Sequence, residues 1–513
     1  MATVKIDQFG GIAPRQHPTQ LADGMAVKAH NVRLKTGKLV PLREPKLVEG
    51  PNIILEDGLS DVADAKSLHV WRKADGSFDF LLFKGVTWSA PGNIAADDLT
   101  RIVVSGDRTG DGTVDKPVVY IRDSGVKVVY EINKDPLDAP KVDRAAGSAD
   151  LSTGTIRYTR FFVTWVDKYN MESPVSPASL VVDETYLASD GWTYDAATEK
   201  ITKGGESIDV SSSAWTVTMN GGTFVSAQHY GDGDLEYLDG DTVVLRPRGT
   251  IPSLATKVRV YKVITGMEEG RIQFVYELDA SSVGAGGFSF TVKDEDAGEI
   301  MPEIEAPPED LSCIHDVPGA FYVGFSPSAP KTVCFSDIDL LYSWPVAYRY
   351  DVADNLVALA VTSNTVFALT DGWPYVLSGT APESMAVAKL AGPAACVSPR
   401  GVCVYRNAVY YVGNQGLMTI YNSADAGTVC QNLTDKIFTK DQWLAYNPSS
   451  CVMGQFDGAL VLFFTLADGS HKALSIDLME NSAVAVTTHD EAASCLCVDN
   501  REDKLYYVRE GGL

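Results

Sequence analysis

Residues 356–370 read LVALAVTSNTVFALT, which is two apolar runs joined by the polar pair Ser363-Asn364. Two apolar runs separated by two turn-forming residues are typical of a β-hairpin. The same pattern recurs at Val452–Leu466, where Asp457-Gly458 is among the strongest two-residue hairpin signals. It recurs again at Leu68–Phe83. Short strands paired with their neighbours along the chain are therefore expected to decide the fold.

Most other apolar segments are short and rich in Val, Ile, Tyr and Phe, and turn-forming residues bound them, which is typical of strands. Examples are Phe80–Phe83, Pro117–Ile121, Val126–Tyr130, Thr155–Val166, Lys257–Val263, Gln273–Leu278, Val409–Val412 and Leu505–Val508. Helical spacing of apolar residues is found over Gln20–Val32, and a second short helix is expected within Asp435–Tyr446. The sequence predicts an all-β protein with one or two small helices.

After residue 310 the strand clusters recur about every 40 residues, which is the size of a four-stranded propeller blade. The clusters are Gly319–Val323, Leu356–Leu377, Val402–Tyr421, Met453–Asp477 and Ser494–Val508. This period predicts a β-propeller of about five to six blades. The alternative is a stack of unrelated β-sandwiches, because no consensus dipeptide repeats.

The texture of the sequence changes along the chain and predicts four zones. Residues 1–60 form an N-terminal arm with a short helix, and residues 61–145 form the first part of the propeller. Residues 146–305 form an inserted β-sandwich of immunoglobulin or fibronectin type, with an extra hairpin insert at about 185–245. Residues 306–513 supply the remaining blades. The boundary between the sandwich and the remaining blades is the proline-rich stretch Pro302–Glu309. Proline disfavours a helix there and lacks the backbone N–H that a strand would donate to its neighbour.

The composition is that of a globular protein with a strongly acidic balance. The chain has 513 residues, 45% of them apolar, and a net charge of −24 from 43 basic and 67 acidic residues. Stable binding to nucleic acid or anionic lipid is disfavoured, because both require a basic surface. No run approaches the ~18 apolar residues of a membrane span, and the start lacks a secretory signal. We expect synthesis in a cytoplasm, with the protein staying there or leaving by another route.

The eight cysteines all lie beyond residue 312. At this chain length and without a secretory signal, we expect reduced and buried thiols rather than disulfides. A metal or redox role is the alternative. Only Cys495 and Cys497 are close in sequence, and in a strand that spacing places both on one face.

No catalytic signature is found. The seven histidines are scattered, and the zincin, nucleophile-elbow and phosphate-loop patterns are absent. A glycosidase would need two carboxylates about 5–9 Å apart, and Asp371-Gly-Trp373 is a single partial echo of a sialidase box. The sequence predicts a protein that is not an enzyme, with no cofactor.

Two acidic loops are candidates for Ca²⁺ binding. In the first, Asp107, Asp111 and Asp115 resemble the start of an EF-hand loop, but Thr109 and Val118 stand where further carboxylates belong. The second is Gly231–Asp241. Solvated turn acids are the default reading of both loops.

A resemblance appears at the N-terminus, where Phe9-Gly-Gly-Ile-Ala-Pro-Arg15 precedes Ala29-His-Asn-Val-Arg-Leu-Lys-Thr-Gly-Lys-Leu-Val-Pro-Leu-Arg43. This order resembles the opening of the tail nozzle proteins of short-tailed bacteriophages, the family that includes tail tubular protein B. Further stretches resemble the family in the same order along the chain. They are Arg157–Ser176, Val258–Gly266, Gln273–Glu277, Val333–Asp337, Ser343–Tyr348, Val366–Met385 and Asn414–Leu417. The insert at 185–245 and the cysteines match no part of the pattern.

The resemblance implies a structural virion protein of the phage tail, assembled in the host cytoplasm. It implies a hexameric ring that contacts adaptor or portal-side tail proteins and tail fibres, and through which DNA passes transiently during ejection. An acidic wall would repel phosphates and let the genome slide. The alternatives are a receptor-binding or glycan-cleaving propeller protein on the virion, and a secreted lectin from a host.

Overall fold

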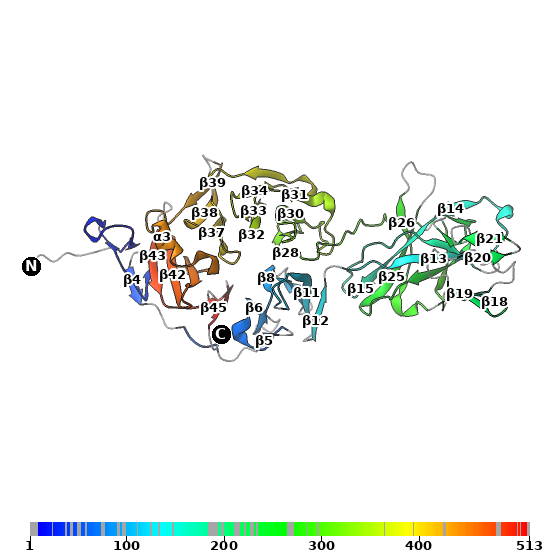
Figure 1. The fold of residues 1–513 in the computed structure, drawn as a ribbon, viewed down its shortest axis with the longest axis horizontal. Helices are drawn as coiled ribbons and strands as arrows, with labels where there is room; N and C mark the ends of the chain where they lie inside the picture. The colour runs from blue at the N-terminus through cyan, green and yellow to red at the C-terminus, as the bar shows by residue number, and fades with distance from the viewer. Residues whose placement is uncertain are drawn as a thin grey trace, which may run out of the picture. The chain divides into compact units, whose positions relative to one another are not determined.

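A computed structural model gives the fold (Figure 1). It describes residues 1–513 except 1–8, 23, 36–37, 42–44, 49–52, 57–58, 73–76, 90–92, 95–98, 110, 124–125, 132–133, 146–147, 183–192, 196–197, 199, 210–215, 220–221, 226–229, 232–233, 264–270, 285, 294, 296, 364, 393, 424–426, 479–483, 500, 503 and 510–513.

The chain forms two compact units. Unit 1 comprises Met1–Asn133 and Pro307–Leu513, and unit 2 comprises Lys134–Ala306. Both units are built of β-strands in many small sheets, so the all-β prediction is confirmed.

Four sheets of unit 1 have four antiparallel strands each, which follow one another in sequence order. Their strands are β28 (Ser312–Val317), β29 (Phe321–Phe325), β30 (Thr332–Phe335) and β31 (Arg349–Asp351); β32 (Leu356–Thr362), β33 (Thr365–Thr370), β34 (Tyr375–Ser378) and β35 (Ala386–Lys389); β36 (Val402–Tyr405), β37 (Ala408–Gly413), β38 (Gly416–Ser423) and β39 (Gly427–Asn432); and β40 (Val452–Phe456), β41 (Ala459–Thr465), β42 (His471–Leu478) and β43 (Val484–His489).

Three further sheets of unit 1 come from the two ends of the chain. They are β44 (Cys495–Asp499) with β45 (Lys504–Val508); β5 (Ile53–Leu55), β7 (Phe78–Phe83) and β6 (Ser67–Arg72); and β8 (Val86–Ser89), β9 (Asn93–Ile94), β10 (Leu99–Gly106), β11 (Asp115–Asp123) and β12 (Val126–Glu131).

The seven sheets contact one another in a closed cycle over the part of the chain that the structure describes. β28 contacts β32, β32 contacts β36, β36 contacts β40, β40 contacts β44, β44 contacts β6, β6 contacts β8, and β8 contacts β28. Figure 1 shows the blue and cyan strands from the start of the chain between the red strands from its end and the green strand β28. Six of these contacting strands, namely β28, β32, β36, β40, β44 and β8, are the first strands of their sheets in sequence order.

The predicted hairpins are present. β40 and β41 pair up to Phe456 and Ala459, and the turn residues Asp457 and Gly458 both have positive φ, 47° and 82°. Two positive φ values are the requirement of the tight hairpin turn that Asp-Gly favours. β32 pairs with β33, and β6 pairs with β7, although Asn364 and residues 74–76 of their turns lie outside the described residues.

The cycle closes between the two ends of the chain. A hydrophobic cluster joins Leu68, Phe80 and Leu82 to Cys495 and Val508, which lie more than 400 positions later. The aromatic rings of Phe80 and Tyr506 lie edge to face at 4.9 Å in the same cluster. Closure therefore depends on apolar side chains supplied by both ends.

Within its described residues, unit 2 has two main sheets and three smaller ones. The two main sheets are β22 (Tyr230–Gly231), β16 (Leu180–Val182), β13 (Asp138–Arg144), β24 (Thr242–Arg248) and β27 (Phe288–Thr291); and β15 (Phe161–Asp167), β25 (Ala255–Val263) and β26 (Ile272–Asp279). The smaller ones are β14 (Arg157–Thr159) with β23 (Leu235–Tyr237); β17 (Thr193–Asp195), β18 (Lys200–Lys203) and β19 (Glu206–Asp209); and β20 (Thr216–Met219) with β21 (Gly222–Val225). One apolar core lies between the main sheets and includes Val142, Phe161, Val243 and Val260. The immunoglobulin or fibronectin type stays a prediction.

The boundary expected at residue 146 needs a correction. Strand β13 lies before it, within the zone assigned to the first part of the propeller, but it belongs to unit 2. There Val142 pairs with Val181 of β16 and Leu245 of β24. The sequence did not indicate this pairing for two reasons. The strand contains acidic residues and a proline, which are uncommon in strands. Its partner strands lie about 40 and 100 positions later, so no local pattern identifies them.

The predicted helix Gln20–Val32 is wrong. That segment contains the end of the 3-10 helix η1 (Pro18–Gln20), strand β2 (Met25–Ala26) and the first residue of β3 (Val32–Lys35). β2 pairs with β1 (Gly11–Ile12), and β3 pairs with β4 (Lys38–Pro41). The Gly10 N–H donates to the Gly24 carbonyl at 2.9 Å, and Gly24 has φ of +83°. The positive φ of Gly24 and the long-range backbone hydrogen bonds therefore outweigh the helical spacing of the apolar residues in this segment.

The second expected helix is present in shortened form as α3 (Lys440–Leu444). Thr439 begins it with a capping box, in which its hydroxyl accepts from Gln442 N–H and the Gln442 side chain accepts from Thr439 N–H. Trp443 on this helix is fully buried and donates to the Gly413 carbonyl at 2.8 Å.

Candidate functional site

The first candidate calcium loop is held together by its own aspartates. Asp107 accepts from Gly112 N–H at 3.0 Å, and Asp111 accepts from Thr113 N–H at 2.8 Å. Asp115 accepts two further loop amides at 2.6 and 2.8 Å. The hydrogen bonds from Thr113 lower the pKa of Asp111. Capping of backbone N–H groups therefore accounts for a carboxylate at each of the three positions.

The acids of the second loop face arginines. Asp241 accepts from Arg144 Nε at 2.9 Å, and Asp234 accepts from Arg160 Nε at 2.7 Å. Residues 232 and 233 lie outside the described residues. Among the residues that the structure does describe, no group of three or more His, Cys, Asp and Glu side chains is placed to hold a metal ion.

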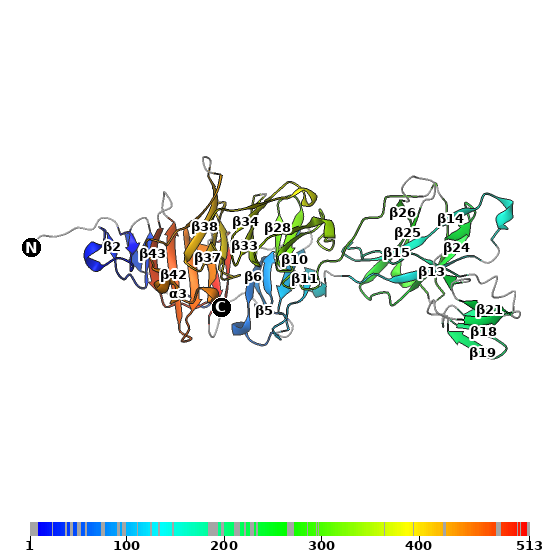
Figure 2. The ribbon, with the colours of Figure 1, turned by 45° about the horizontal axis from the view of Figure 1, so that its top comes forward.

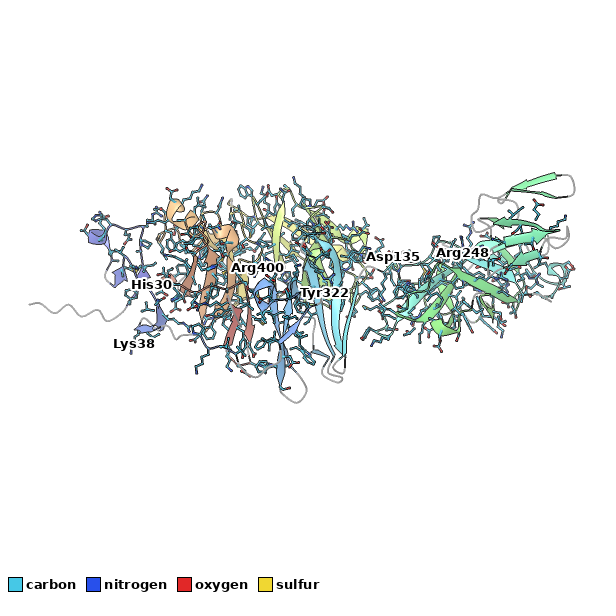
Figure 3. All side chains as sticks on the ribbon, turned by 60° about the horizontal axis from the view of Figure 1, so that its bottom comes forward. His30, Lys38, Asp135, Arg248, Tyr322 and Arg400 are labelled. Atoms are coloured by element: carbon cyan, nitrogen blue, oxygen red, sulfur yellow. The ribbon has the colours of Figure 1, made fainter. Side chains whose placement is uncertain are left out.

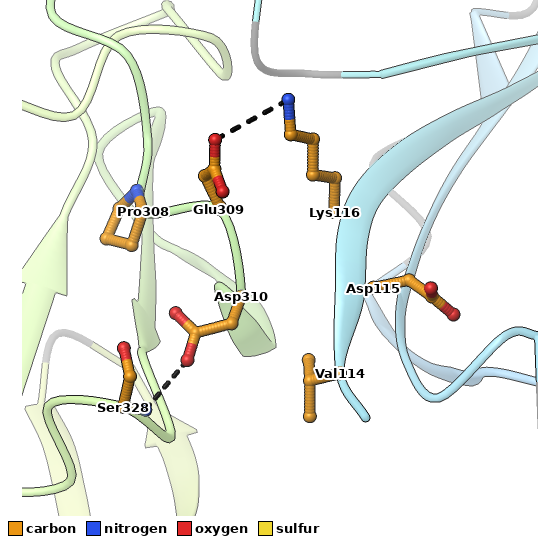
Figure 4. Close-up of a pocket in the computed structure, with 7 residues that line it drawn as sticks. All are labelled: Val114, Asp115, Lys116, Pro308, Glu309, Asp310 and Ser328. Atoms are coloured by element: carbon orange, nitrogen blue, oxygen red, sulfur yellow. Dashed lines mark hydrogen bonds and ion pairs between the residues drawn. The ribbon is translucent and has the colours of Figure 1, made fainter. Parts of the chain in front are cut away.

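A surface pocket of about 670 Å³ lies in unit 1, where β11 begins beside residues 308–310 (Figure 4). Lys116 Nζ lies 3.6 Å from Glu309 Oε1 across it. The Asp310 carboxylate accepts from Ser328 N–H at 2.7 Å and also from the Ser326 hydroxyl. Lys116, Glu309 and Asp310 each have a protein partner, so none of these three charges is available to bind a ligand in the pocket.

The most elaborate polar arrangement is the contact between the arm and the sheet β40–β43. We call described residues 9–41 the arm and its binding surface the arm site. The arm site consists of Asp435, Ile437, Gln442, Phe456, Asp457, Ala485, Val486, Thr488 and Asp490. Figures 1 and 2 both show β43 next to the arm, and β1 and β3 contact β43.

Main-chain pairing joins the arm to the outer strand of the sheet. Thr488 N–H donates to the Ala29 carbonyl at 3.0 Å, and Asn31 N–H donates to the Thr488 carbonyl at 2.8 Å. His30 and Thr488 thus form a parallel bridge. The arm acts here as an added strand, which satisfies backbone groups of an edge strand.

The glycine pair of the N-terminal motif is explained by the arm site. Gly11 has φ of +99°, and a Cβ atom there would lie 2.6 Å from Val486 N and 3.0 Å from Ala485 Cα. Ile12 next to it is buried in the core cluster of the sheet. Only glycine allows both this backbone conformation and this close approach.

Charged and polar side chains anchor the arm at both ends. Arg15 donates through its main-chain N–H to the Ile437 carbonyl at 3.0 Å, and its guanidinium donates to the Asp435 carbonyl. Arg33 lies 3.1 Å from the Asp457 carboxylate. His30, labelled in Figure 3, lies on the same arm.

The His30 imidazole makes two contacts with the arm site. Its Nε2 lies 2.7 Å from Asp490 Oδ2, and its Nδ1 lies 3.1 Å from Thr488 Oγ1. His489, which follows the bridge residue Thr488 in the sequence, is buried, and its Nδ1 has no hydrogen-bond partner. The arm site therefore contains a half-buried contact between His30 and Asp490 beside a buried imidazole.

Acid is expected to destabilise unit 1 through His489. Burial, with smaller effects of His30 and Arg33, lowers the pKa of His489 from 6.5 to about 4. Below pH 6.5 the unfolded chain takes up a proton that the folded protein does not, so the free energy of unfolding falls by about 3 kcal/mol between pH 6.5 and 4. Burial lowers the pKa values of His69 and His315 to about 4 as well, which adds to the fall over the same range.

The measurement is urea unfolding of wild type and His489→Asn at several pH values between 4 and 7. The variant is expected to show a shallower pH dependence, while His17→Asn, which changes an exposed side chain, keeps the wild-type slope. Equal slopes for wild type and His489→Asn would contradict the prediction.

The eight cysteines are all free, and five of them are buried, as the sequence predicts. Cys313 Sγ accepts from Leu359 N–H at 3.2 Å, and burial raises the pKa of Cys313 to about 12. Cys495 and Cys497 pack in one cluster, and burial raises the pKa of each to about 11. A thiol that stays protonated is a poor nucleophile and a poor metal ligand.

The Asp-Gly-Trp echo at 371–373 is a structural turn. The Asp371 carboxylate accepts from Asn355 N–H at 3.0 Å, and Trp373 N–H donates to Asp354 at 3.2 Å. These bonds tie the loop before β32 to the loop after β33. Both carboxylates are used to hold backbone.

Residues 172–179 of unit 2, which begin with Glu172 and Ser173 before Pro174, take the place of a strand beside β15. The hydroxyl oxygens of Ser173 and Ser176 accept from the N–H groups of Trp165 and Val163, at 3.1 and 3.0 Å. Ser179 does the same for Phe161 at 3.0 Å. The N–H groups of the three serines donate back to the carbonyls of these β15 residues. The serines thus supply the acceptors that a proline-rich segment needs in order to cover a sheet edge.

The arm site was missed in the sequence, although its motif was noticed. Gly10-Gly11 belongs to the N-terminal motif that resembles nozzle proteins, but its partner strand lies more than 470 positions later. Nothing local identifies Thr488 or Val486 as its contacts.

Comparisons with known proteins give no family for this chain. No family model matches, and no curated protein matches. Among solved structures, apo AztD from Citrobacter koseri is similar at 13% identity with a TM-score of 0.27, over 69% of this chain and 77% of that one. An ancestral GH74 enzyme is similar at 11% identity with a TM-score of 0.24, over 85% and 74%. The periplasmic gluconolactonase PpgL of Pseudomonas aeruginosa is similar at 9% identity with a TM-score of 0.26, over 69% and 99%. Similarities this low carry no argument about function.

Within the described residues, no helix is both long and apolar enough to cross a membrane.

Proposed function

We propose that this chain is a non-enzymatic structural subunit of a bacteriophage tail nozzle, a conduit for genome ejection and a platform for fibres and adaptor. The observation that carries the proposal is the order of the nozzle-like motifs along the chain, from Phe9–Arg15 to Asn414–Leu417. In this proposal the localisation is the virion, after assembly in the host cytoplasm.

The positions of two of these motifs support a structural role. The N-terminal motif places Gly11 against Val486 and anchors Arg15 on the Asp435 and Ile437 carbonyls. The Glu172–Ser176 motif covers the edge of β15. Residues that hold backbone together are what a subunit under mechanical load needs, whereas a substrate site would need side chains free to bind a ligand.

The proposal includes the architecture. Each of the seven sheets in the cycle is taken as one blade of a β-propeller, in place of the five to six expected, and unit 2 as the inserted immunoglobulin-like sandwich. The acidic balance of −24 would then let DNA slide along a wall that repels phosphates.

Electron microscopy of the purified protein tests the proposal. Ring-shaped particles with sixfold symmetry are the expected result. Trimeric spikes would favour receptor binding, and cleavage of host polysaccharide by the same preparation would favour an enzyme. Either of these outcomes would overturn the nozzle proposal.

A further inference from the structure

The arm site has the character of a binding site between two molecules. Its central contact is strand addition, through two main-chain hydrogen bonds between the arm and Thr488. Proteins use this mode to bind extended segments of partners, with main-chain bonds for affinity and side-chain pockets for specificity. Thr488 directs both its N–H and its carbonyl to the arm, so the two backbone groups of this edge residue bind the arm and not another strand of the sheet.

The specificity of the site comes from close fit and complementary charge. Gly11 allows backbone to approach backbone at Val486, and Ile12 is buried beside it. Two cationic groups of the arm, Arg15 and Arg33, are bound by carbonyl oxygens or a carboxylate of the site. A segment of different sequence would lose the glycine contact or leave these oxygens without a donor.

The connection between the arm and the cycle of sheets allows the arm to bind either the arm site of its own chain or the arm site of a second copy. The arm ends with β4 at Pro41, and β5 begins at Ile53, so eleven residues join the arm to the cycle of sheets. Eleven residues extend to at most about 40 Å. Exchange of an identical element between two copies keeps every docking contact and costs little beyond association.

We propose that the arm site is an interface between copies of this chain, and that its occupant in the assembly is the arm of a second copy. The inference is independent of the nozzle proposal, because it concerns a pairwise contact and not a ring. The same contacts as in the single chain hold the second copy: strand addition at Thr488, the glycine contact at Val486, and the anchors at Arg15, His30 and Arg33.

The experiment mixes two full-length variants that are each defective in one half of the contact. Gly11→Ala disables the arm, because its Cβ would meet Val486 N at 2.6 Å. Thr488→Pro disables the site, because it removes the N–H that Ala29 accepts, at an edge position where proline is tolerated. The matched control is Gly392→Ala, since Gly392 has nearly the same φ, +95°, with nothing within 4 Å of a Cβ atom.

Size is measured by light scattering coupled to gel filtration. Each defective variant alone is expected to be a monomer, and an equimolar mixture is expected to give a 1:1 complex that joins the intact arm of Thr488→Pro to the intact site of Gly11→Ala. The mixture of Gly392→Ala with Thr488→Pro should give particles of the same size as the mixture of wild type with Thr488→Pro. A mixture of the two defective variants that stays monomeric at every ratio would overturn the inference.

A second pair of variants covers the possibility that Thr488→Pro fails to fold. His30→Asp places a carboxylate against Asp490, and Asp490→Lys reverses the charge of an exposed residue of the site. Mixing these two variants matches Asp on one arm with Lys on the other site, so a 1:1 complex is expected again, and its absence counts against exchange. A complex formed by a protein that makes no sixfold particles would support arm exchange and refute the nozzle proposal.

Discussion

Glu172→Ala is expected to unfold unit 2 selectively, with a loss of about 3–5 kcal/mol in its free energy of unfolding. The Glu172 carboxylate is buried and accepts from Arg259 Nη1 at 2.7 Å, from Tyr261 Oη at 2.6 Å and from the Thr164 hydroxyl. Its removal leaves a partly buried guanidinium and two buried hydroxyls without this acceptor. A buried donor that loses its partner keeps the full cost of its desolvation.

Hydrogen exchange of the β15 and β25 amides, with calorimetry of the intact chain, measures this effect. The matched control is Glu277→Ala, since Glu277 accepts from the same Arg259 at 2.8 Å but is more exposed. We expect the control to cost about 1 kcal/mol or less. If both variants lower the stability of unit 2 equally, burial of Glu172 is not the cause.

Asp499→Ala is expected to open the cycle of sheets in unit 1, with a loss of about 3 kcal/mol. Asp499 is buried and pairs with Arg72, which lies on β6 at the other end of the chain. The pair lies next to the cluster in which Phe80 contacts Tyr506. Loss of the carboxylate leaves the Arg72 charge poorly compensated where the two ends meet.

The control for this prediction is Glu502→Ala. Glu502 lies 3.5 Å from the same Arg72 side chain but is a third exposed, so solvent screens the pair and its loss is expected to change the stability far less than Asp499→Ala does. The measurement is limited proteolysis, with mass spectrometry to locate the first cuts. Asp499→Ala should release β44 and β45 first, and cuts spread evenly through unit 1 would contradict this.

Much of the fold could be predicted from local patterns. The hairpin at Asp457-Gly458 follows from its own two residues, because both adopt positive φ. The strands of unit 2 between Thr242 and Thr291 follow from their Val, Tyr and Phe content. The burial of the thiols follows from chain length and residue type.

The candidate site could not be predicted in the same way. Helical spacing over Gln20–Val32 is real as a pattern, but backbone pairing with Thr488 overrides it. The calcium candidates at Asp107, Asp111 and Asp115 have the right residue type, yet in the structure these carboxylates hold loop amides. Residue type at a given spacing does not say whether an oxygen already has a donor.

The sequence by itself determined which segments become strands, where the tight turns fall, and that the protein is acidic, because these properties depend on neighbouring residues and on composition. Only the tertiary structure decided that β6 meets β44, that β13 belongs to unit 2, and that Gly11 lies against Val486. These contacts join residues from about 40 to more than 470 positions apart. Each contact has to offset the entropy of closing a long loop, and no local pattern encodes which distant residues will meet.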